Sequence, residues 1–297
     1  MKGDLRWLPG FIALGVVWGS SFLFIELALE SFTPAAIVFL RGALGALSLM
    51  VLLSIRKDRL PAWGKHWWHI TVVAALLNAV PGFLFALGQQ WVPSSLAGIA
   101  NATTPMMTVL VVAVAFRDQK PSANQFLGIT IGIVGIVLVT EVIGAFEGAT
   151  VLGVGILLAA TLSYGIAMPY AKRHVSTLPY SAYALAAAQV GVSAIITAPG
   201  VFLSGVVNQP LTSSAVWGIL GLGVLGTGIA YVWNYRNIEL VGSVIASSVT
   251  YITPVVAVIF GVVLLRETLS PAQLLGGALV IVSALLVQER WVVIRKK

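Results

Sequence analysis

A few polar and aromatic side chains interrupt the long apolar runs of this chain, and their chemistry could recognise a small molecule. Aromatic walls with a few hydrogen-bonding groups form pockets that suit small zwitterions or planar compounds. We therefore predict that these residues line a binding cavity, the alternative for each being a packing or membrane-interface role. The candidates are Trp18, Ser21, Asn78, Tyr164, Gln189, Tyr231, Asn234 and Tyr251.

Arg41 is the only basic residue that falls inside one of the apolar runs. A charge at that depth is costly in lipid and usually faces a cavity or a partner group. Two interpretations stay open: Arg41 binds a ligand carboxylate, or it forms a structural pair with Glu26, Glu30 or a helix-end carbonyl. Gln189 is its approximate counterpart in the second half of the chain, so that half lacks the charge.

Pro105 and Pro254 lie inside apolar runs, at equivalent places in the two halves of the chain. A proline in a helix leaves the carbonyl four residues earlier without its usual donor. Those carbonyls belong to Asn101 and Thr250, whose polar side chains could bond the freed backbone or face a ligand. We predict that the two prolines are hinges and that Asn101 and Thr250 lie beside the ligand; the alternative is a packing kink.

Several kinds of chemistry are excluded or disfavoured. The chain has no Cys, which excludes disulfides, thiol catalysis and Cys-ligated metals. A membrane enzyme would need a nucleophile–base pair or metal ligands within the spans, and no carboxylate or His falls at the centre of an apolar run. We therefore expect no enzyme, no metal and no cofactor. Glu26 is the one plausible proton-coupling acid, and its place at the end of a run favours a solvated helix-end group instead.

The composition places the chain in a membrane, because 59% of its residues are hydrophobic and only 9% are charged, against about 25% charged in a soluble domain. A span needs about 20 mostly apolar residues, and the short connections leave no room for a soluble domain. No cleavable signal peptide is expected. We predict an all-α polytopic membrane protein with ten transmembrane helices, at about residues 8–28, 34–55, 68–90, 95–116, 124–143, 151–171, 180–202, 214–234, 243–264 and 271–290.

The Lys and Arg residues indicate how these spans are oriented. Placing the N-terminus inside leaves Arg266 as the one basic residue outside and Arg41 within a span, while all the others of the 17 are cytoplasmic. Cytoplasmic loops carry such an excess of positive charge. We predict a multi-pass protein of the cell (inner) membrane with both termini cytoplasmic, and we attribute the net charge of +7 to topology and not to nucleic-acid binding.

The two halves of the chain share a pattern at a constant separation in sequence. The recurring pairs are Ser94/Ser243, Ala97/Ala246, Thr104/Thr253, Pro105/Pro254, Val109/Val258 and Arg117/Arg266. Five spans per half is an odd number, so the second half must enter the membrane inverted relative to the first. We predict two inverted five-helix repeats, residues 1–147 and 148–297, around a shared central cavity, which is the organisation of a secondary transporter working by alternating access.

Several motifs carry a resemblance: Trp18-Gly19-Ser20-Ser21-Phe22, Arg41, Pro105, Pro254, and Arg266-Glu267-Thr268-Leu269-Ser270 followed by Gln273 and Gly276. With these motifs nearly the whole chain resembles the drug/metabolite transporter superfamily, in its ten-span EamA-type branch. The resemblance implies an exporter of small metabolites, most similar to exporters of aromatic and other amino acids. One departure is Tyr164-Gly165 where the first half has Trp18-Gly19, which predicts an asymmetric cavity.

Two other transport functions remain as alternatives. A multidrug exporter of organic cations would need an acid deep in the cavity, and a channel would need a charged ring or a carbonyl filter; both are disfavoured here. The expected partners are a small-molecule substrate, amino acids above all, and the lipid bilayer, with no nucleic acid. We expect a monomer or a homodimer, the dimer through Gly128, Gly132 and Gly135, whose spacing allows close helix contact.

Overall fold

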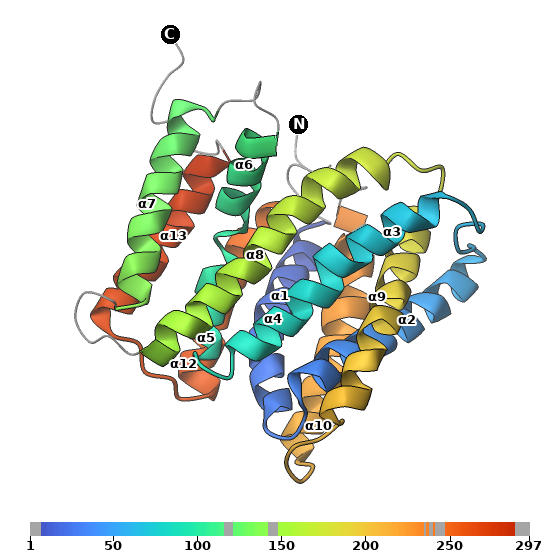
Figure 1. Ribbon diagram of the computed structural model, residues 1–297, viewed down its shortest axis with the longest axis horizontal. Helices are drawn as coiled ribbons and strands as arrows, with labels where there is room; N and C mark the ends of the chain where they lie inside the picture. Colours follow the sequence, from blue (N-terminus) through green and yellow to red (C-terminus); the bar gives the residue numbers. More distant parts are fainter. Residues whose placement is uncertain are drawn as a thin grey trace.

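The computed structural model describes residues 7–115, 121–141, 148–234, 236–237, 240 and 247–288. In these residues the backbone is helical apart from loops and one isolated β-bridge, between Phe32 and Val207. Figure 1 shows the long helices lying side by side. The elements are α1 (Leu8–Leu29), α2 (Pro34–Arg56), α3 (His66–Ala74), η2 (Ala75–Ala79), α4 (Val80–Gly88), α5 (Ser94–Asn101), α6 (Thr104–Ala115), α7 (Ala123–Val139), α8 (Gly148–His174), α9 (Ala182–Ser204), α10 (Ser213–Leu220), η3 (Gly221–Ile229), η4 (Ser247–Tyr251), α12 (Ile252–Leu264) and α13 (Pro271–Val287).

The predicted spans coincide with helices. Seven helical runs are long and apolar enough to cross a membrane: Leu8–Leu29, Pro34–Arg56, His66–Gly88, Ser94–Ala115, Gly148–His174, Ala182–Ser204 and Ser213–Asn234. Three shorter apolar helices, Ala123–Val139, Val249–Leu264 and Pro271–Val287, lie at the predicted fifth, ninth and tenth spans. The all-helical polytopic class is confirmed, whereas the number of crossings and the orientation stay predictions. Arg117, Ser243 and Ala246 of the repeat lie outside the described residues.

Two helices at equivalent places in the repeats begin in the same way. The Ser122 hydroxyl accepts a hydrogen bond from the backbone N–H of Gln125, and the Gln125 side-chain oxygen accepts one from the backbone N–H of Ser122. Ser270 and Gln273 form the same reciprocal pair at the start of α13. Such a capping box satisfies two backbone donors that a helix start would otherwise leave free. The recurring glutamine of the sequence is therefore a helix-start signal.

Spans at equivalent places in the two predicted repeats pack against each other in antiparallel order. Gly128, near the start of α7, approaches Val287 at the end of α13, whereas Gly276, near the start of α13, approaches Val139 at the end of α7. The same antiparallel order joins α2 to α9 (Ala35 near Gly200, Leu53 near Tyr183) and α5 to α12 (Ser95 near Gly261, Gly98 near Ala257). Inverted repeats require opposite directions for equivalent spans.

The glycines of α7 serve packing within the chain. A Cβ added at Gly132 would lie 2.5 Å from the Ser283 hydroxyl, and one at Gly135 would lie 2.8 Å from the Gly276 carbonyl oxygen. No side chain other than hydrogen fits at that separation, so these small residues let α7 and α13 approach closely. The face that we considered for a dimer is therefore occupied by α13.

Two close crossings between other helices are also equivalent in the two halves. A Cβ at Gly19 on α1 would lie 2.5 Å from the Val256 Cβ on α12. A Cβ at Gly165 on α8 would lie 2.9 Å from the Met107 backbone on α6. The Trp18-Gly19 and Tyr164-Gly165 pairs of the sequence therefore share a structural reason for their glycine, whatever their aromatic residues do.

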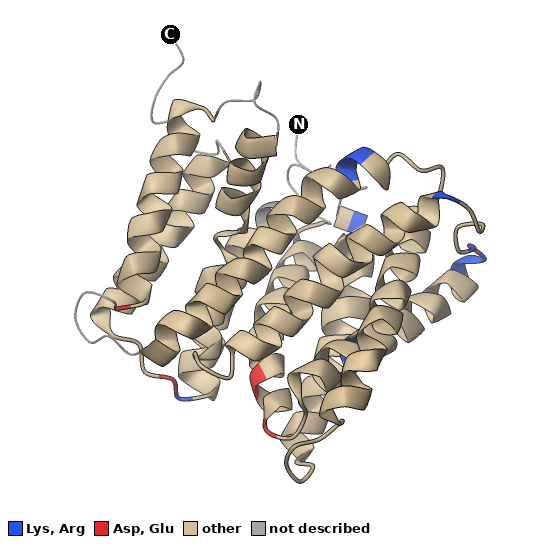
Figure 2. Ribbon diagram, viewed as in Figure 1, with Lys and Arg blue, Asp and Glu red and all other residues tan. Residues whose placement is uncertain are grey.

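Charged residues separate toward the two ends of the bundle. In Figure 2 the Lys and Arg gather mainly at the upper end and the Asp and Glu mainly at the lower end. Large apolar side chains on the flanks are exposed, with Phe202 at 90% and Leu203 at 89%. An apolar flank between charged ends is what a bilayer environment requires, because lipid tails cover such side chains.

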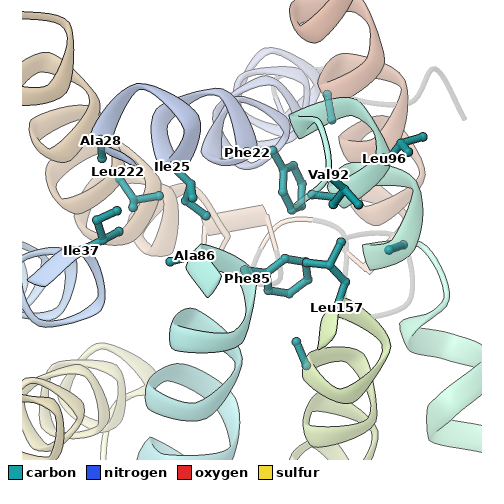
Figure 3. Close-up of a cluster of buried hydrophobic side chains, with 14 of the residues drawn as sticks. Phe22, Ile25, Ala28, Ile37, Phe85, Ala86, Val92, Leu96, Leu157 and Leu222 are labelled. Carbon is teal, nitrogen blue, oxygen red and sulfur yellow. The ribbon is translucent and has the colours of Figure 1, made fainter. Parts of the chain in front are cut away.

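The largest apolar cluster of the described residues joins helices of both halves of the chain. Phe22 and Ile25 of α1 pack with Phe85 of α4 and Leu157 of α8, and Figure 3 shows Phe22 and Phe85 facing each other. Their ring centroids are 5.6 Å apart in an edge-on arrangement, which is a preferred geometry for aromatic pairs. This cluster fixes α1 against α4 on the acidic side of the bundle.

Candidate functional site

A small cavity lies between four helical segments, about halfway along the spans His66–Gly88 and Ala182–Ser204. Its wall consists of Val38, Arg41 and Gly42 from α2, Asn78 from η2, Val190 and Ser193 from α9, and Thr227 from η3. The predicted repeats relate α2 to α9 and η2 to η3. The cavity is therefore bounded by equivalent segments of the two halves, where a transporter built from repeats has its binding site.

The first of these segments, the π-helix η2, is followed by Pro81. A π-helix joins each N–H to the carbonyl five residues earlier, and Pro81 has no N–H to give to the Leu76 carbonyl. The hydroxyl of Ser163 on α8 donates to that carbonyl instead, at 2.7 Å. π-Segments are rare and frequently lie at functional sites, and this one places Asn78 in the cavity wall.

The second π-helix, η3, is rich in glycine, which is a poor α-helix former. The Thr227 hydroxyl donates to the Leu222 carbonyl five residues earlier, at 3.1 Å. A Cβ at Gly228 would lie 2.5 Å from the Ser48 Cβ, so the glycine lets η3 approach α2. The sequence predicted a span in each of these regions without indicating a π-segment, and the structure attributes the two π-segments to Pro81 and the glycines.

Arg41 is the charge in this cavity. Its Nε donates to the Thr227 hydroxyl at 3.1 Å, and no carboxylate of the described residues forms an ion pair with it. The structural pairs that we considered are absent there, because Glu26 accepts from Gln89 and Glu30 accepts from Thr212. A guanidinium held inside the bundle without a carboxylate has the chemistry to bind an anionic group.

Two buried amide donors also lack partners, one in the cavity wall and one next to a wall residue in sequence. Asn78 Nδ2 is buried without a hydrogen bond, and so is Nε2 of Gln189, which precedes Val190 of the cavity wall. An unsatisfied buried donor costs about 1–3 kcal/mol. Donors held in this way favour a ligand that presents hydrogen-bond acceptors, as a carboxylate does.

Tyr164 and Tyr231 bring aromatic side chains toward the same charge. Both lie within electrostatic range of Arg41. Tyr164 packs on Phe85, with ring centroids 6.1 Å apart, and Tyr231 packs against the cluster that joins α2 to α9 around Leu49. Of the predicted set, Arg41 and Asn78 belong to the cavity wall, whereas Tyr164, Gln189 and Tyr231 do not, and their contact with substrate stays a prediction.

Trp18, Ser21 and Asn234 are not part of the cavity wall. Trp18 packs with Trp233 against a separate cluster that includes Leu14. Ser21 donates to a carbonyl of its own helix at 3.3 Å, and Asn234 is half-buried at the end of its span. Their predicted contact with substrate stays a prediction for another conformation of the protein.

The two prolines follow breaks in their helices, and the freed carbonyls have partners that we did not predict. The Thr104 hydroxyl donates to the Asn101 carbonyl at 2.8 Å. The Thr253 hydroxyl donates to the Thr250 carbonyl at 2.9 Å. The sequence left open whether the side chains of Asn101 and Thr250 bond the freed backbone or face a ligand, and the structure adds the threonine before each proline as a partner of that backbone. That Thr-Pro pair recurs in both halves, so the sequence contained the signal.

Tyr251, the last predicted cavity residue, has its hydroxyl engaged at the end of the bundle. It donates to Gln288 Oε1 at 2.5 Å and so joins the ninth predicted span to the tenth. Tyr251 and Thr250 are both half-buried, and neither is part of the cavity wall.

The segment that begins at Arg266 has a structural role. Glu267 accepts hydrogen bonds from the backbone N–H of Ser94 at 2.8 Å and of Ser95 at 3.0 Å. A carboxylate at a helix start is favoured by the unpaired N–H groups and the helix dipole. Gly261 is required beside it, because a Cβ there would collide with the carboxylate. Arg266 adopts φ +58°, the left-handed turn that directs Glu267 toward α5.

Sequence reasoning missed two polar residues of the cavity, Ser193 and Thr227. Thr227 stands at the same separation from Asn78 as Pro254 does from Pro105. The repeat therefore contained a signal for Thr227, because an equivalent of a candidate residue is itself a candidate. Ser193 has no such counterpart, since Leu44 stands at that separation from it.

Comparison with known families and proteins gives a consistent result. Residues 5–141 and 151–288 each match the EamA-like transporter family. "Uncharacterized inner membrane transporter YedA" of Escherichia coli (strain K12) is 28% identical, with 93% of this chain and 88% of that protein covered. The "Probable terminal-alkyne amino-acid exporter" of Streptantibioticus cattleyicolor is 26% identical, with 93% and 91% covered.

A further relative and a solved structure share the same length of chain. "Uncharacterized transporter YoaV" of Bacillus subtilis is 24% identical, with 91% of this chain and 92% of that protein covered. A crystal structure whose title states no function matches with a TM-score of 0.65 at 18% identity, covering 96% of both chains. At that identity the match supports the fold alone.

Proposed function

The chain belongs to the EamA-like transporter family, and on this premise we propose that it is a secondary transporter that exports small metabolites, with amino acids, aromatic ones included, as the favoured substrates. A relative of similar length is named as an amino-acid exporter. The single observation that carries the proposal is Arg41, a guanidinium without a described carboxylate partner in a cavity between equivalent helical segments.

The cavity in this state encloses room for only about one water molecule, so the substrate requires a wider form of it, in which the two ends of an amino acid are bound differently. The carboxylate is bound by Arg41 and by the unpartnered amide donors of Asn78 and Gln189, since a guanidinium binds carboxylates through paired N–H groups. The ring of an aromatic substrate packs near Tyr164 and Tyr231. A cationic ammonium finds ring faces there, which attract cations.

Transport proceeds by alternating access between two inverted five-helix repeats, residues 1–147 and 148–297. Two matches to one family, over 5–141 and 151–288, support the repeats. The antiparallel packing of α2 with α9 and of α7 with α13 supports their inversion. The breaks at Pro105 and Pro254 are the hinges, and they bias opposite mouths because equivalent helices are inverted.

The proposed setting is the cell (inner) membrane, with ten spans and both termini cytoplasmic. The relative YedA is named an inner membrane transporter, and the basic and acidic ends seen in Figure 2 agree with the positive-inside rule. In this orientation the acidic end faces outward. The protein works in the bilayer as a monomer or homodimer, without nucleic acid.

A multidrug exporter of organic cations is the alternative function. Arg41 disfavours it, because a like charge in a cavity of low dielectric repels a cationic ligand. A channel is a weaker alternative, because irregular helices in equivalent places fit a moving carrier better than a fixed pore.

Counterflow in proteoliposomes tests the proposal. Vesicles loaded with an unlabelled amino acid are expected to accumulate the same labelled amino acid transiently, with saturation and stimulation from the opposite side. Amino-acid methyl esters, which lack the carboxylate, are expected to compete at least about tenfold more weakly, as the loss of a charged hydrogen-bonding partner of 1.5–3 kcal/mol implies. Accumulation of organic cations with no response to amino acids would establish the alternative function instead.

A further inference from the structure

Glu26 is not the solvated helix-end group that the sequence led us to expect. It lies on α1, half-buried, and accepts a hydrogen bond from Gln89 Nε2 at 3.3 Å. The same Nε2 donates to the Phe22 carbonyl at 2.9 Å, and Gln89 is only 4% exposed. The pair therefore joins α1 to the end of α4, beside the Phe22–Phe85 contact.

No described cation neutralises this carboxylate. The other charged groups within its electrostatic range are Glu267 and Glu30, both acidic. Among the helices packed on α1 at this end, α4, α5, α10 and α12 contain no Lys, Arg or His. Arg41 of α2 bonds Thr227 and is not among the charged groups that act on Glu26. Arg266 precedes Glu267 and is exposed, outside ion-pair distance of the described carboxylates. A carboxylate away from water without a cation is costly unless it takes up a proton.

The surroundings of the two carboxylates contain unused hydrogen-bonding atoms. Gln89 Oε1 is buried and has no partner, although its amide is directed at Glu26 through Nε2. The hydroxyls of Ser94 and Ser95 are also buried without partners, while their N–H groups hold Glu267. An ionised carboxylate only accepts hydrogen bonds, so it offers nothing to the free Gln89 oxygen.

We propose that Glu26 and Gln89 form a proton-binding site that closes the outer end of the protein. A proton from the external water adds to the Glu26 carboxylate, which becomes a neutral acid with one O–H donor. That O–H donates to Gln89 Oε1, while Nε2 donates back to the acid, so that a reciprocal acid–amide pair joins α1 to α4. Loss of the proton removes the donor, and the remaining charge favours hydration and separation of the two helices.

Cysteine labelling tests this proposal without any substrate. The chain has no native Cys, so Val92→Cys places a single thiol in the buried outer cluster. Its reaction with an impermeant maleimide added outside is divided by that of Asn208→Cys, an exposed position, which corrects for thiol ionisation. The ratio is expected to rise about tenfold between external pH of about 5 and about 8, a typical coupling between a ligand and a conformation.

Two carboxylate variants complete the test. Glu26→Gln, which keeps a donor for Gln89 Oε1 without titrating, is expected to hold the ratio low at every pH. Glu30→Gln is the matched control on the same helix, because Glu30 is exposed and bonds Thr212 instead, and it is expected to keep the wild-type pH dependence. Leu269→Cys, half-buried in the same cluster, replaces Val92→Cys if that variant does not fold.

The outcomes separate this site from the proposed function. A flat ratio, a ratio that follows sodium concentration instead of pH, or a Glu26→Gln protein that still responds to pH would each overturn the proton site. The proposal rests on the orientation proposed above, and failure of Asn208→Cys to react from outside would contradict that orientation. Amino-acid counterflow tests the transport function separately.

Discussion

The two sides of the cavity contrast in chemistry although they are equivalent in backbone. The first half contributes Arg41 and Asn78, and the second half has Val190 and Thr227 at the same separation in sequence. Both halves provide a π-helical segment at this level. Under the proposed function, the duplicated backbone serves motion, whereas the charge that would recognise a ligand is held by one half alone.

The largest expected effect comes from removing that charge. Arg41→Gln is expected to lower kcat/KM for amino-acid counterflow by about 30-fold or more, because a buried charged contact is worth about 2–5 kcal/mol. Arg41→Lys should have a kcat/KM between those of the wild type and Arg41→Gln, since Lys keeps the charge without the paired N–H groups. Ser193→Ala on the opposite wall is the comparison and should change the rate far less. Equal losses of kcat/KM in Arg41→Gln and Ser193→Ala would contradict the proposal that the first half alone recognises the substrate charge.

Substitution of the glycine at the two equivalent helix crossings, Gly19 and Gly165, should lower stability by similar amounts, because both crossings belong to the backbone that the two halves share. Gly19→Ala and Gly165→Ala each place a Cβ within 3 Å of another helix and are expected to destabilise the protein by about 1–3 kcal/mol. Gly155→Ala is the control, because its added Cβ meets nothing within 4 Å. Thermal unfolding in detergent measures all three, and a Gly165→Ala protein as stable as the control would break the equivalence.

The Thr-Pro breaks allow a sharper test of the same equivalence. Thr104→Val leaves the Asn101 carbonyl without its donor and is expected to cost about 1–3 kcal/mol. Pro105→Ala restores an N–H for that carbonyl, so the double variant should recover most of the loss. Thr253→Val with Pro254→Ala should behave in the same way in the second half. Additive losses in either double variant would show that the threonine does not replace the missing backbone bond.

The smallest effect is expected where α2 ends against the start of α9. Ser181 donates to Asp58, and this hydrogen bond is the main reason why the pKa of Asp58 lies below its usual value of 3.8. A lowered carboxylate pKa stabilises the folded state above pH 3.8, and the gain disappears as the pH falls through the folded-state pKa. Because Asp58 is solvated, loss of this bond in Ser181→Ala should cost less than about 1 kcal/mol near neutral pH, in addition to a pH-independent cost of about 1 kcal/mol because the Ser181 hydroxyl also accepts from the Ala184 N–H at the start of α9. Unfolding that is equally sensitive to Ser181→Ala at about pH 2 and about pH 7 would contradict this account.

The bounds of the helices could be predicted from the sequence to within a few residues, because long apolar runs with charged ends follow directly from the cost of burying polar groups in lipid. The sequence did not reveal the π-segments at Asn78 and Thr227. These depend on contacts between helices, such as the Ser163 hydroxyl on the Leu76 carbonyl, and no local pattern specifies a partner 87 residues away.

Part of the candidate site could also be predicted from the sequence. Arg41 stands out by composition alone, because a charge inside an apolar run is rare. The role of Glu26 depended on Gln89, 63 residues away in sequence, so position along a helix misled us about its solvation. The partners of the freed carbonyls were local, at Thr104 and Thr253, and a search for hydroxyls beside the prolines would have found them.

The most direct test of the central claim is the accessibility of Ser193→Cys, a single thiol in the cavity wall. An impermeant reagent is applied to right-side-out and to inside-out vesicles, with and without a transported amino acid. Alternating access around this cavity predicts labelling from both sides and slower labelling when the amino acid is present. Labelling from one side only, or labelling that a transported amino acid does not slow, would contradict it.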